Sequence, residues 1–181
     1  MKSVIELSPV AKKFVLQWGE LGMKWGVNRT VAQIHALLFI SERPLTAAEI
    51  AETLSVAQSN VSTSLRELQG WRLIRTVPVM GDRREHYESL KDVWDMFKIV
   101  LDERKRREVD PTLEMLKECM AELGHTATDA HTAERLNTMK DFFEETAGWY
   151  NEIKPMPIGV LRKLMRLGSK VQKFLGVSSS N

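Results

Sequence analysis

Apolar residues recur every three or four positions along most of the chain, which is the spacing of amphipathic helices. The first such stripe predicts one helix over residues 4–25 and consists of Leu7, Val10, Phe14, Trp18, Leu21 and Trp25. A second helix is predicted over residues 30–40, with inward positions at Val31, Ile34, Leu37 and Leu38. A stripe of the first kind packs on other helices of its own chain or on a partner subunit, so residues 1–29 are expected to form an N-terminal dimerisation helix.

The next segment carries a clear helix-start signal. Thr46 and Glu49 have the spacing of a capping box, in which each side chain bonds the other residue's backbone amide. The helix that starts there runs to about Leu54, and a short turn leads to a second helix over about 58–70. The inward positions of these two helices are expected to be Ile50, Ala51, Leu54, Val61, Leu65 and Leu68. Two short helices joined in this way form a helix-turn-helix.

A β-hairpin is predicted directly after these helices. Residues 73–79 are rich in β-branched side chains, residues 80–83 have turn composition, and residues 85–89 alternate around Tyr87. A short hairpin behind a helix-turn-helix is a wing. The predicted fold class is therefore mainly α with a small β-hairpin wing, in which a winged helix-turn-helix domain over residues 30–90 is flanked by N-terminal and C-terminal dimerisation helices.

Beyond the wing the helical spacing returns. Ser89 is expected to cap the first of these helices, and Asp110 with Pro111 is expected to start the second. The inward positions are expected to be Val93, Phe97, Val100 and Leu101 in the first helix, Leu113, Leu116, Met120 and Leu123 in the second, and Leu136, Met139, Phe143 and Tyr150 in the third.

Pro155 and Pro157 separate a last helix, over residues 158–175, from those before it. This helix is basic on one side and apolar on the other, so it is expected to pack on the dimer, with a place near DNA or on a membrane surface as alternatives. We expect residues 91–176 to form a C-terminal helical region for dimerisation and effector binding. Residues 177–181 are expected to be a disordered tail.

The outer side of the helix over residues 58–70 carries candidate DNA contacts. It presents short hydroxyls and one guanidinium, without a carboxylate among them: Ser59, Ser62, Thr63 and Arg66. Such a helix can enter the major groove, where hydroxyls reach bases or phosphates and arginine pairs with guanine. An ordinary solvated helix face has a similar composition. The order of the surrounding elements is what favours DNA.

The predicted hairpin tip supplies a second set of candidates. Arg83 and Arg84 lie there beside Asp82. A guanidinium at a hairpin tip can enter the minor groove, where narrow A·T-rich geometry concentrates negative potential. Asp82 can orient one of the two through a charge-assisted pair. The alternative is an ordinary charged turn.

Composition narrows the function classes. The net charge of +2 is compatible with DNA binding but does not demand it. The single cysteine, Cys119, excludes an internal disulfide framework, and the N-terminus lacks a signal peptide's apolar region, so a cytoplasmic protein is expected. The histidines and Cys119 have no zinc spacing, and the chain has neither a phosphate-cradling glycine loop nor a nucleophile elbow. No metal, cofactor or enzymatic activity is expected.

Three stretches carry a family resemblance: residues 43–54 (RPLTAAEIAETL), 60–75 (NVSTSLRELQGWRLIR) and 81–89 (GDRREHYES). With them the chain resembles the GbsR branch of the MarR-like winged-helix regulators. The resemblance implies a homodimeric transcription regulator, with repression as the expected sign, that binds a roughly palindromic double-stranded operator. Matching motif positions place Asn60, Ser62 and Arg66 on the recognition helix and Asp82 and Arg84 in the wing.

The resemblance also implies a candidate effector, because some members sense quaternary ammonium osmoprotectants or their precursors. Aromatic rings bind such cations through cation–π contacts. The candidate rings are Trp18, Trp25, Trp94 and Phe97. Aromatic residues at helical spacing belong more often to a core, which is the competing interpretation.

The chain departs from the family where the recognition helix begins. Members often carry Ser-Lys-Gly where this chain has Ala57, Gln58 and Ser59. Ala57 cannot cap the helix, and Gln58, within the expected DNA-facing set, replaces a cationic phosphate contact. This departure and the low net charge support an alternative function, a winged-helix protein-interaction module that no longer binds DNA.

Overall fold

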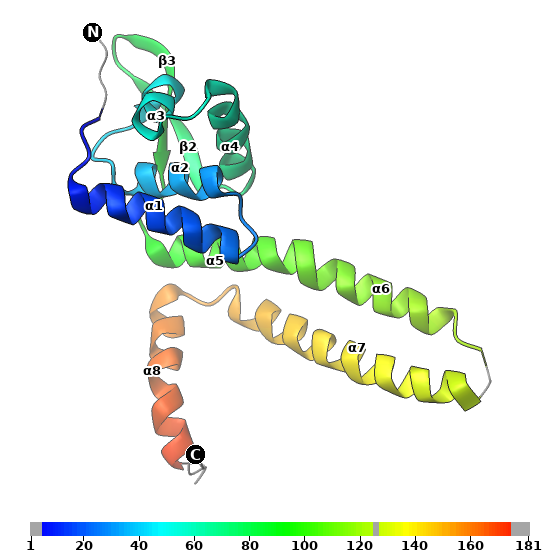
Figure 1. Ribbon diagram of the computed structural model, residues 1–181. Helices are drawn as coiled ribbons and strands as arrows, with labels where there is room; N and C mark the ends of the chain where they lie inside the picture. Colours follow the sequence, from blue (N-terminus) through cyan, green and yellow to red (C-terminus); the bar gives the residue numbers. More distant parts are fainter. Residues whose placement is uncertain (1–4, 125–126, 175–181) are drawn as a thin grey trace. The chain divides into compact units, whose positions relative to one another are not determined.

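The computed structural model describes residues 5–124 and 127–174 and divides the chain into two compact units, residues 1–100 and 101–181 (Figure 1). The first contains α1 (Pro9–Lys24), α2 (Arg29–Ile40), β1 (Leu45–Thr46), α3 (Ala47–Leu54), α4 (Gln58–Gly70), β2 (Ile74–Val79), β3 (Asp82–Ser89) and most of α5 (Val93–Arg104). The second contains the π-helical turn η1 (Lys105–Val109), α6 (Asp110–Ala121), α7 (Ala127–Ile153) and α8 (Ile158–Phe174). The predicted fold class, mainly helical with a small wing, is confirmed. Within the described ranges, no helix has the length and apolar character needed to span a membrane.

The first unit is built around α2, which contacts α1, α3, α4 and β3. Ile34 and Leu37, at its centre, have no exposed surface. The predicted inward positions of α2, α3 and α4 are confirmed as buried or half-buried and packed in one cluster: Val31, Ile34, Leu37, Leu38, Ile50, Ala51, Leu54, Val61, Leu65 and Leu68. Removing these apolar side chains from water is the main driving force for folding this unit.

The N-terminal helix is shorter than predicted, and only part of its predicted stripe is buried: Leu7, Phe14 and Trp18 are half-buried against the core. It begins after Ser8, whose side chain accepts a hydrogen bond from the Ala11 amide (3.2 Å), and not at residue 4. Three positions predicted on the buried stripe are exposed: Val10, Leu21 and Trp25. The fully buried positions are Val15, Gly19 and Gly22.

Two glycines extend the buried side of α1 beyond the predicted stripe. A Cβ on Gly22 would lie 2.5 Å from the Cβ of Ala32, and one on Gly19 would lie 2.7 Å from the Cγ of Gln33. The missing side chains let α1 approach α2 closely, and α1 therefore packs within its own chain. A count of apolar positions gives no weight to glycine and cannot reveal such a contact.

The helix-turn-helix begins as predicted. The Glu49 amide donates to Thr46 Oγ1 (3.3 Å) and the Thr46 amide donates to Glu49 Oε2 (2.8 Å), which completes the capping box. Arg43 donates to the other oxygen of the same carboxylate at 2.6 Å. The helix ends at Ser55, which is left-handed with φ 54°. The following turn delivers the chain to α4 after Ala57, which makes no side-chain cap.

The wing belongs to a three-stranded antiparallel sheet in the order β1-β3-β2. The additional strand, β1, pairs Leu45 with Tyr87 and Thr46 with His86. Two residues are too short to show a strand period, so the sequence did not predict this strand. It joins the start of the helix-turn-helix directly to the central strand of the wing.

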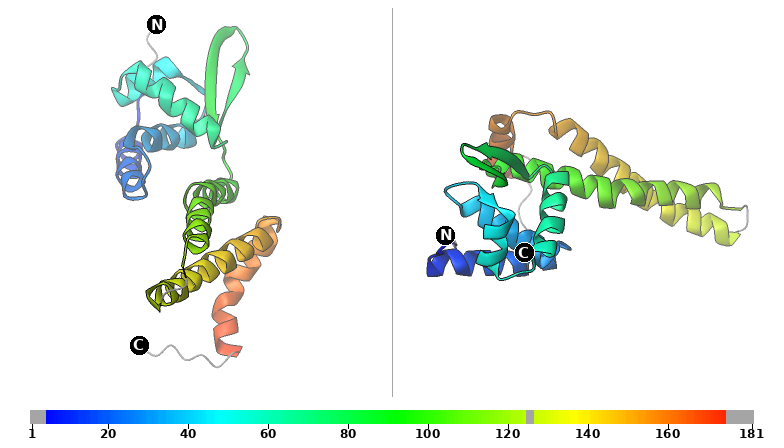
Figure 2. Two further views of the ribbon diagram at one scale, coloured as in Figure 1. Left: turned by 90° about the vertical axis from the view of Figure 1, so that its right-hand side faces the viewer. Right: turned by 90° about the horizontal axis from the view of Figure 1, so that it is seen from above.

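The hairpin itself is longer than predicted. β3 starts at Asp82, inside the expected turn, and the tip consists of Met80 and Gly81, the latter with φ 81°. The strand register shifts between Val77 and Val79, where Pro78 has no amide hydrogen to donate to the ladder. Figure 2 shows the β2–β3 hairpin as a two-stranded ribbon beside α3 and α4.

The helix after the wing is capped by another residue than the one predicted. Ser89 is the last residue of β3, and its hydroxyl donates to the Leu90 carbonyl (3.0 Å). The cap is Asp92, whose Oδ1 accepts from the amides of Trp94 (2.7 Å) and Asp95 (3.1 Å). Helix α5 therefore turns a different side toward the core than the sequence predicted. Met96 is buried, whereas Val93 and Phe97, predicted to face inward, are exposed.

The predicted helix start at Asp110 is also wrong. The helix continues from α5 through the π-helical turn into α6, and Asp110 accepts from Lys105 Nζ (2.6 Å) instead of capping. Pro111 has no amide hydrogen, and its ring would clash with the carbonyl of Arg107 in a regular α-helix. The wider π turn before Pro111 accommodates this ring without breaking the helix.

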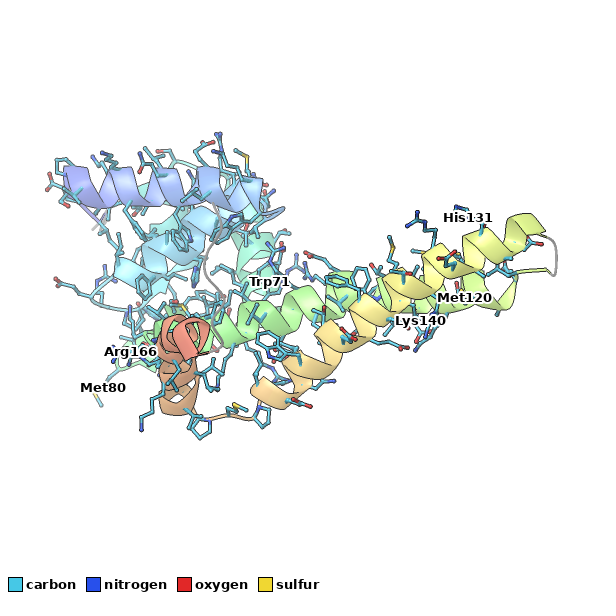
Figure 3. The ribbon with its side chains drawn as sticks, turned by 90° about the horizontal axis from the view of Figure 1, so that it is seen from below. Trp71, Met80, Met120, His131, Lys140 and Arg166 are labelled. Carbon is cyan, nitrogen blue, oxygen red and sulfur yellow. The ribbon has the colours of Figure 1, made fainter. Side chains whose placement is uncertain are left out.

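In the second unit α6 and α7 lie side by side, with Met120 on the first helix and Lys140 on the second (Figure 3). The end of α7 is fixed by Asp102, which accepts from Tyr150 Oη (2.6 Å) and pairs with Lys154 (2.8 Å). Burial opposes the charge of Asp102, but these two bonds outweigh it and lower the pKa of the carboxyl. Burial, together with the bond to this carboxylate, raises the pKa of the Tyr150 hydroxyl.

Several predictions for the C-terminal helices can be compared with the structure. The break at the two prolines is confirmed, and α8 starts directly after Pro157. Leu116 is buried as predicted, but Met139 is exposed. The predicted tail over residues 177–181, Leu175 and the side chain of Val171 lie outside the described residues.

Candidate nucleic-acid interface

The recognition helix α4 separates a buried side from an exposed one. Val61, Ser64, Leu65 and Leu68 are buried. The proposed DNA-facing residues all lie on the exposed side: Gln58, Ser59, Asn60, Ser62, Thr63 and Arg66. Glu67 is half-buried at the edge, so no carboxylate lies among the exposed side chains of this set. This surface can approach a polyanion without repulsion from a carboxylate of its own.

The start of α4 offers amide donors in addition to side chains. Ala57 caps with its backbone carbonyl, which accepts from the amides of Asn60 and Val61. The amides of the first helical turn carry the positive end of the helix dipole and suit a phosphate oxygen. Nearby, Ser62 donates its hydroxyl hydrogen to the Gln58 carbonyl (3.0 Å), which leaves the Ser62 oxygen as an acceptor.

In the wing, Asp82 and Arg84 form a pair joined by several hydrogen bonds. The carboxylate accepts from the Arg84 amide (3.0 Å), from Nε through both of its oxygens (2.9 and 3.0 Å) and from Nη2. The Arg84 guanidinium holds the pKa of the Asp82 carboxyl well below its usual range, because its hydrogen bonds favour the charged form. The pair is therefore ionised at any physiological pH.

The two arginines of the wing tip have different surroundings. Side chains alternate along a strand, so Asp82 and Arg84 share one face of β3 while Arg83 lies on the other. Both arginines are exposed. The structure thus brings Asp82 and Arg84 together, and it places Arg83 apart from them on the sheet.

Sequence reasoning missed His86, which lies on the same face as Asp82 and Arg84 and is buried. Strand alternation at two-residue spacing could have placed these three residues together, but not shown that the histidine is buried. It also missed Lys91, whose Nζ donates to the carbonyls of Leu38 (3.1 Å), Phe39 (2.9 Å) and Ser41 (3.1 Å) at the end of α2. No local pattern predicts a contact over such a sequence separation.

The four aromatic candidates fall into two pairs. Trp18 and Trp25 of the α1 region have ring centroids 6.5 Å apart, and Trp94 and Phe97 of α5 have centroids 6.2 Å apart, both edge to face. An open cavity of about 590 Å³ lies elsewhere in the first unit, and none of these four rings is among its lining residues. It is lined by Ile5, Glu6, Leu7, Lys12, Val15, Leu16, Gln33, Glu52, Thr53, Leu54 and Ser55. Within the described part of the chain, no three His, Cys, Asp or Glu side chains gather as a metal site would require.

Known proteins are similar to this chain in sequence and in fold. The sequence model of the MarR family matches residues 25–85. A solved protein described as "Crystal Structure of a transcriptional regulator" superposes with a TM-score of 0.64 at 21% identity, covering 81% of this chain and 96% of that one. The fold is that of a MarR-type winged helix.

A curated relative extends the likeness beyond the winged helix. It is the "Putative HTH-type transcriptional regulator YvaV" of Bacillus subtilis (strain 168), which is 21% identical over 125 residues. The match covers 69% of this chain and 71% of that protein.

Proposed function

We propose that this chain is a sequence-specific DNA-binding transcription regulator. The observation that carries the proposal is the presence, in one unit, of a carboxylate-free exposed face on α4 and an ionised Asp82–Arg84 pair on the wing. The first suits the major groove and the second the minor groove. The MarR-family match and the regulator names of the similar proteins point to the same function.

Each part has a distinct role in the proposed complex. Arg66 reaches base edges from the major groove, and the hydroxyls and amides at the start of α4 bind phosphates. Arg84 enters the minor groove in the orientation that Asp82 gives it. Arg83, on the other face of the strand, binds the neighbouring backbone. The operator is duplex DNA, and repression is the expected result of occupying it.

Binding of the chain to the duplex upstream of its own coding region tests this proposal. Arg66→Ala and Arg84→Ala should each weaken binding by about 1–3 kcal/mol, measured by fluorescence anisotropy at constant salt. Arg135→Ala, which removes an exposed arginine from α7 in the second unit, serves as the matched control and should leave the affinity unchanged. Unchanged affinity in both interface variants contradicts the assignment.

The same titration separates the proposal from its alternative. A DNA-binding protein loses affinity steeply as salt rises, because its cations release counterions from the phosphates. If the chain binds no duplex even at low salt, the winged helix acts as a protein-interaction module. The uncapped start of α4 at Ala57 is the observation that favours this second function.

We further propose that the regulator is a homodimer on a palindromic operator. The apolar side chains that one copy leaves exposed support this. Phe142 and Trp149 are seven residues apart on α7, and Val160, Leu164 and Leu167 follow the same heptad spacing on α8. Residues 1–29 contribute exposed apolar side chains as well, Trp25 among them.

A quaternary ammonium effector is part of the proposal on the strength of the family resemblance. The two aromatic pairs, Trp18 with Trp25 and Trp94 with Phe97, are its candidate binding groups. Tetramethylammonium and choline should quench tryptophan fluorescence and weaken operator binding. If Trp94→Leu and Trp25→Leu do not alter this response, the effector site is elsewhere, and the cavity beside α3 is the place to search.

A further inference from the structure

His86 is buried on the wing, whereas Arg84 on the same strand face is exposed and Asp82 is half-buried. Side chains alternate along β3, so Asp82, Arg84 and His86 share one face of the strand. Of these three, His86 is buried, with 5% of its surface exposed. Its strand partners are Thr46 on β1 and Val77 on β2. A polar ring in this position needs partners for its nitrogens.

The two ring nitrogens face the two members of the wing pair. Nδ1 lies 2.9 Å from the Arg84 carbonyl oxygen, and because a carbonyl only accepts, the ring donates this hydrogen bond. Nε2 lies 3.5 Å from Asp82 Oδ2, the oxygen that also accepts from Arg84 Nη2. His86 thus holds the backbone of Arg84 and borders the carboxylate that binds its guanidinium.

The Asp82–Arg84 pair does not by itself fix the direction in which the guanidinium points. Asp82 binds the Nε–Nη2 edge of the guanidinium and leaves the Nη1 side for another acceptor. Asp82 is the first residue of β3, next to the exposed tip, so the direction of that free side depends on how firmly the strand end is held. His86 supplies this hold, because it lies where β3 is paired with both neighbouring strands.

We propose that His86 is a positioning residue for the wing arginine: it fixes the backbone of Arg84 and the place of Asp82, so that the guanidinium meets DNA in one orientation. His86 acts through Arg84 and does not touch DNA, because it is buried. The inference rests on the proposed DNA-binding function and adds a residue to it. Binding strength is gained because the groove need not order the arginine itself.

The test combines His86→Leu with Arg84→Ala in a double-mutant cycle. Leucine fills the site with a similar volume and removes both polar contacts, so the melting temperature should stay within a few degrees. The dissociation constant for the upstream duplex should rise about 3- to 10-fold. In the Arg84→Ala background the same substitution should change it by less than about 2-fold, because the residue through which it acts is gone.

Two further variants keep the test independent of folding. His86→Asn retains a donor near the Nδ1 position and should recover part of the affinity that leucine loses. Glu88→Gln is the matched control on the same strand face: it alters the cross-strand pair with Arg75 and should leave the affinity unchanged. If leucine causes early melting, the asparagine variant is used in the same cycle, and the smaller loss that it still causes should likewise disappear in the Arg84→Ala background.

The outcomes separate the inference from the function on which it rests. Equal losses from His86→Leu with and without Arg84 overturn the inference, as does unchanged affinity in His86→Leu when Arg84→Ala weakens binding. If the unmodified chain binds no duplex at low salt, the DNA-binding function fails and the inference fails with it. A loss that disappears in the Arg84→Ala background establishes the positioning role.

Discussion

The two units of the chain differ in how completely a single copy buries its apolar side chains. In the first unit, Ile34 and Leu37 have no exposed surface and belong to one continuous apolar cluster. In the described part of the second unit, Leu116 and Leu161 are the buried hydrophobic residues. Phe142 and Trp149 on α7 are 62% and 63% exposed. Large exposed aromatic side chains mark surfaces that bind a partner. The contrast supports DNA contact by the first unit, whose core is complete within one copy, and self-association by the second. Trp25, which is 58% exposed, shows that the first unit leaves some apolar surface open as well.

Charging the exposed face of α7 should produce the largest effect. Replacing Phe142 and Trp149 together by aspartate should weaken self-association by about 100-fold or more, because two aromatic anchors of an interface are lost and charge is introduced. Analytical ultracentrifugation over a dilution series measures the change. The first unit should keep its far-ultraviolet spectrum and its melting transition.

Asn151→Asp provides the matched control for this charge. Asn151 is exposed on the same helix, and its position is turned by about half a turn from Phe142 and Trp149. The control should leave the dimer intact. A dimer that survives the double substitution places the interface elsewhere, with the exposed side chains of α1 as the next surface to charge.

The same contrast between the two units explains which parts of the structure could be predicted from the sequence alone. In the first unit the capping box of Thr46 and Glu49 and the apolar spacing of α2 to α4 are local signals, and they predicted these elements correctly. The DNA-facing residues of α4 were predicted as the positions that remained on this helix once its buried stripe had been assigned. The N-terminal stripe was predicted only in part. Leu7, Phe14 and Trp18 pack on the core as expected, but the close approach of Gly19 and Gly22 to α2 is a contact between helices that apolar spacing cannot show.

In the second unit, the helix start predicted from local capping signals was wrong. Pro111 signals a helix start in most sequences, but here a π turn absorbs it inside one continuous helix. Met139 was expected to face inward because of its helical spacing, but it is exposed. The helix carries aromatic side chains on more than one side, so spacing alone does not identify its buried side. The part of the site that depends on tertiary structure, His86, could not be predicted either, because its burial requires both neighbouring strands.

The stability of the first unit should depend on pH through His35. Burial lowers the pKa of this histidine to about 4, and its Nε2 has no hydrogen-bond partner among the described residues. The unfolded chain takes up the proton near pH 6.5, whereas the folded chain does so only near pH 4. The free energy of unfolding should therefore fall by roughly 2–3 kcal/mol as the pH is lowered across this window. Urea titrations at several pH values measure the fall.

His35→Leu isolates the contribution of this residue from that of other titrating groups. Leucine cannot bind a proton and leaves no unsatisfied nitrogen at this half-buried position, so it should remove this part of the pH dependence without loss of stability at pH 7. Parallel stability curves for the two proteins between pH 4 and 6.5 would show that His35 is protonated equally in both states.

The smallest effect concerns a single long-range contact of the first unit. Lys91 donates to three carbonyls at the end of α2 and thereby caps that helix from more than fifty residues away in sequence. Lys91→Met should lower the free energy of unfolding by about 1 kcal/mol and speed amide hydrogen exchange at Ser41, whose amide bonds the Leu37 carbonyl. Lys13→Met, at an exposed position of α1, is the matched control and should change neither quantity. Unchanged exchange at Ser41 in the Lys91 variant would mean that water caps α2 as well as the lysine does, and that the first unit owes its cohesion to its apolar core alone.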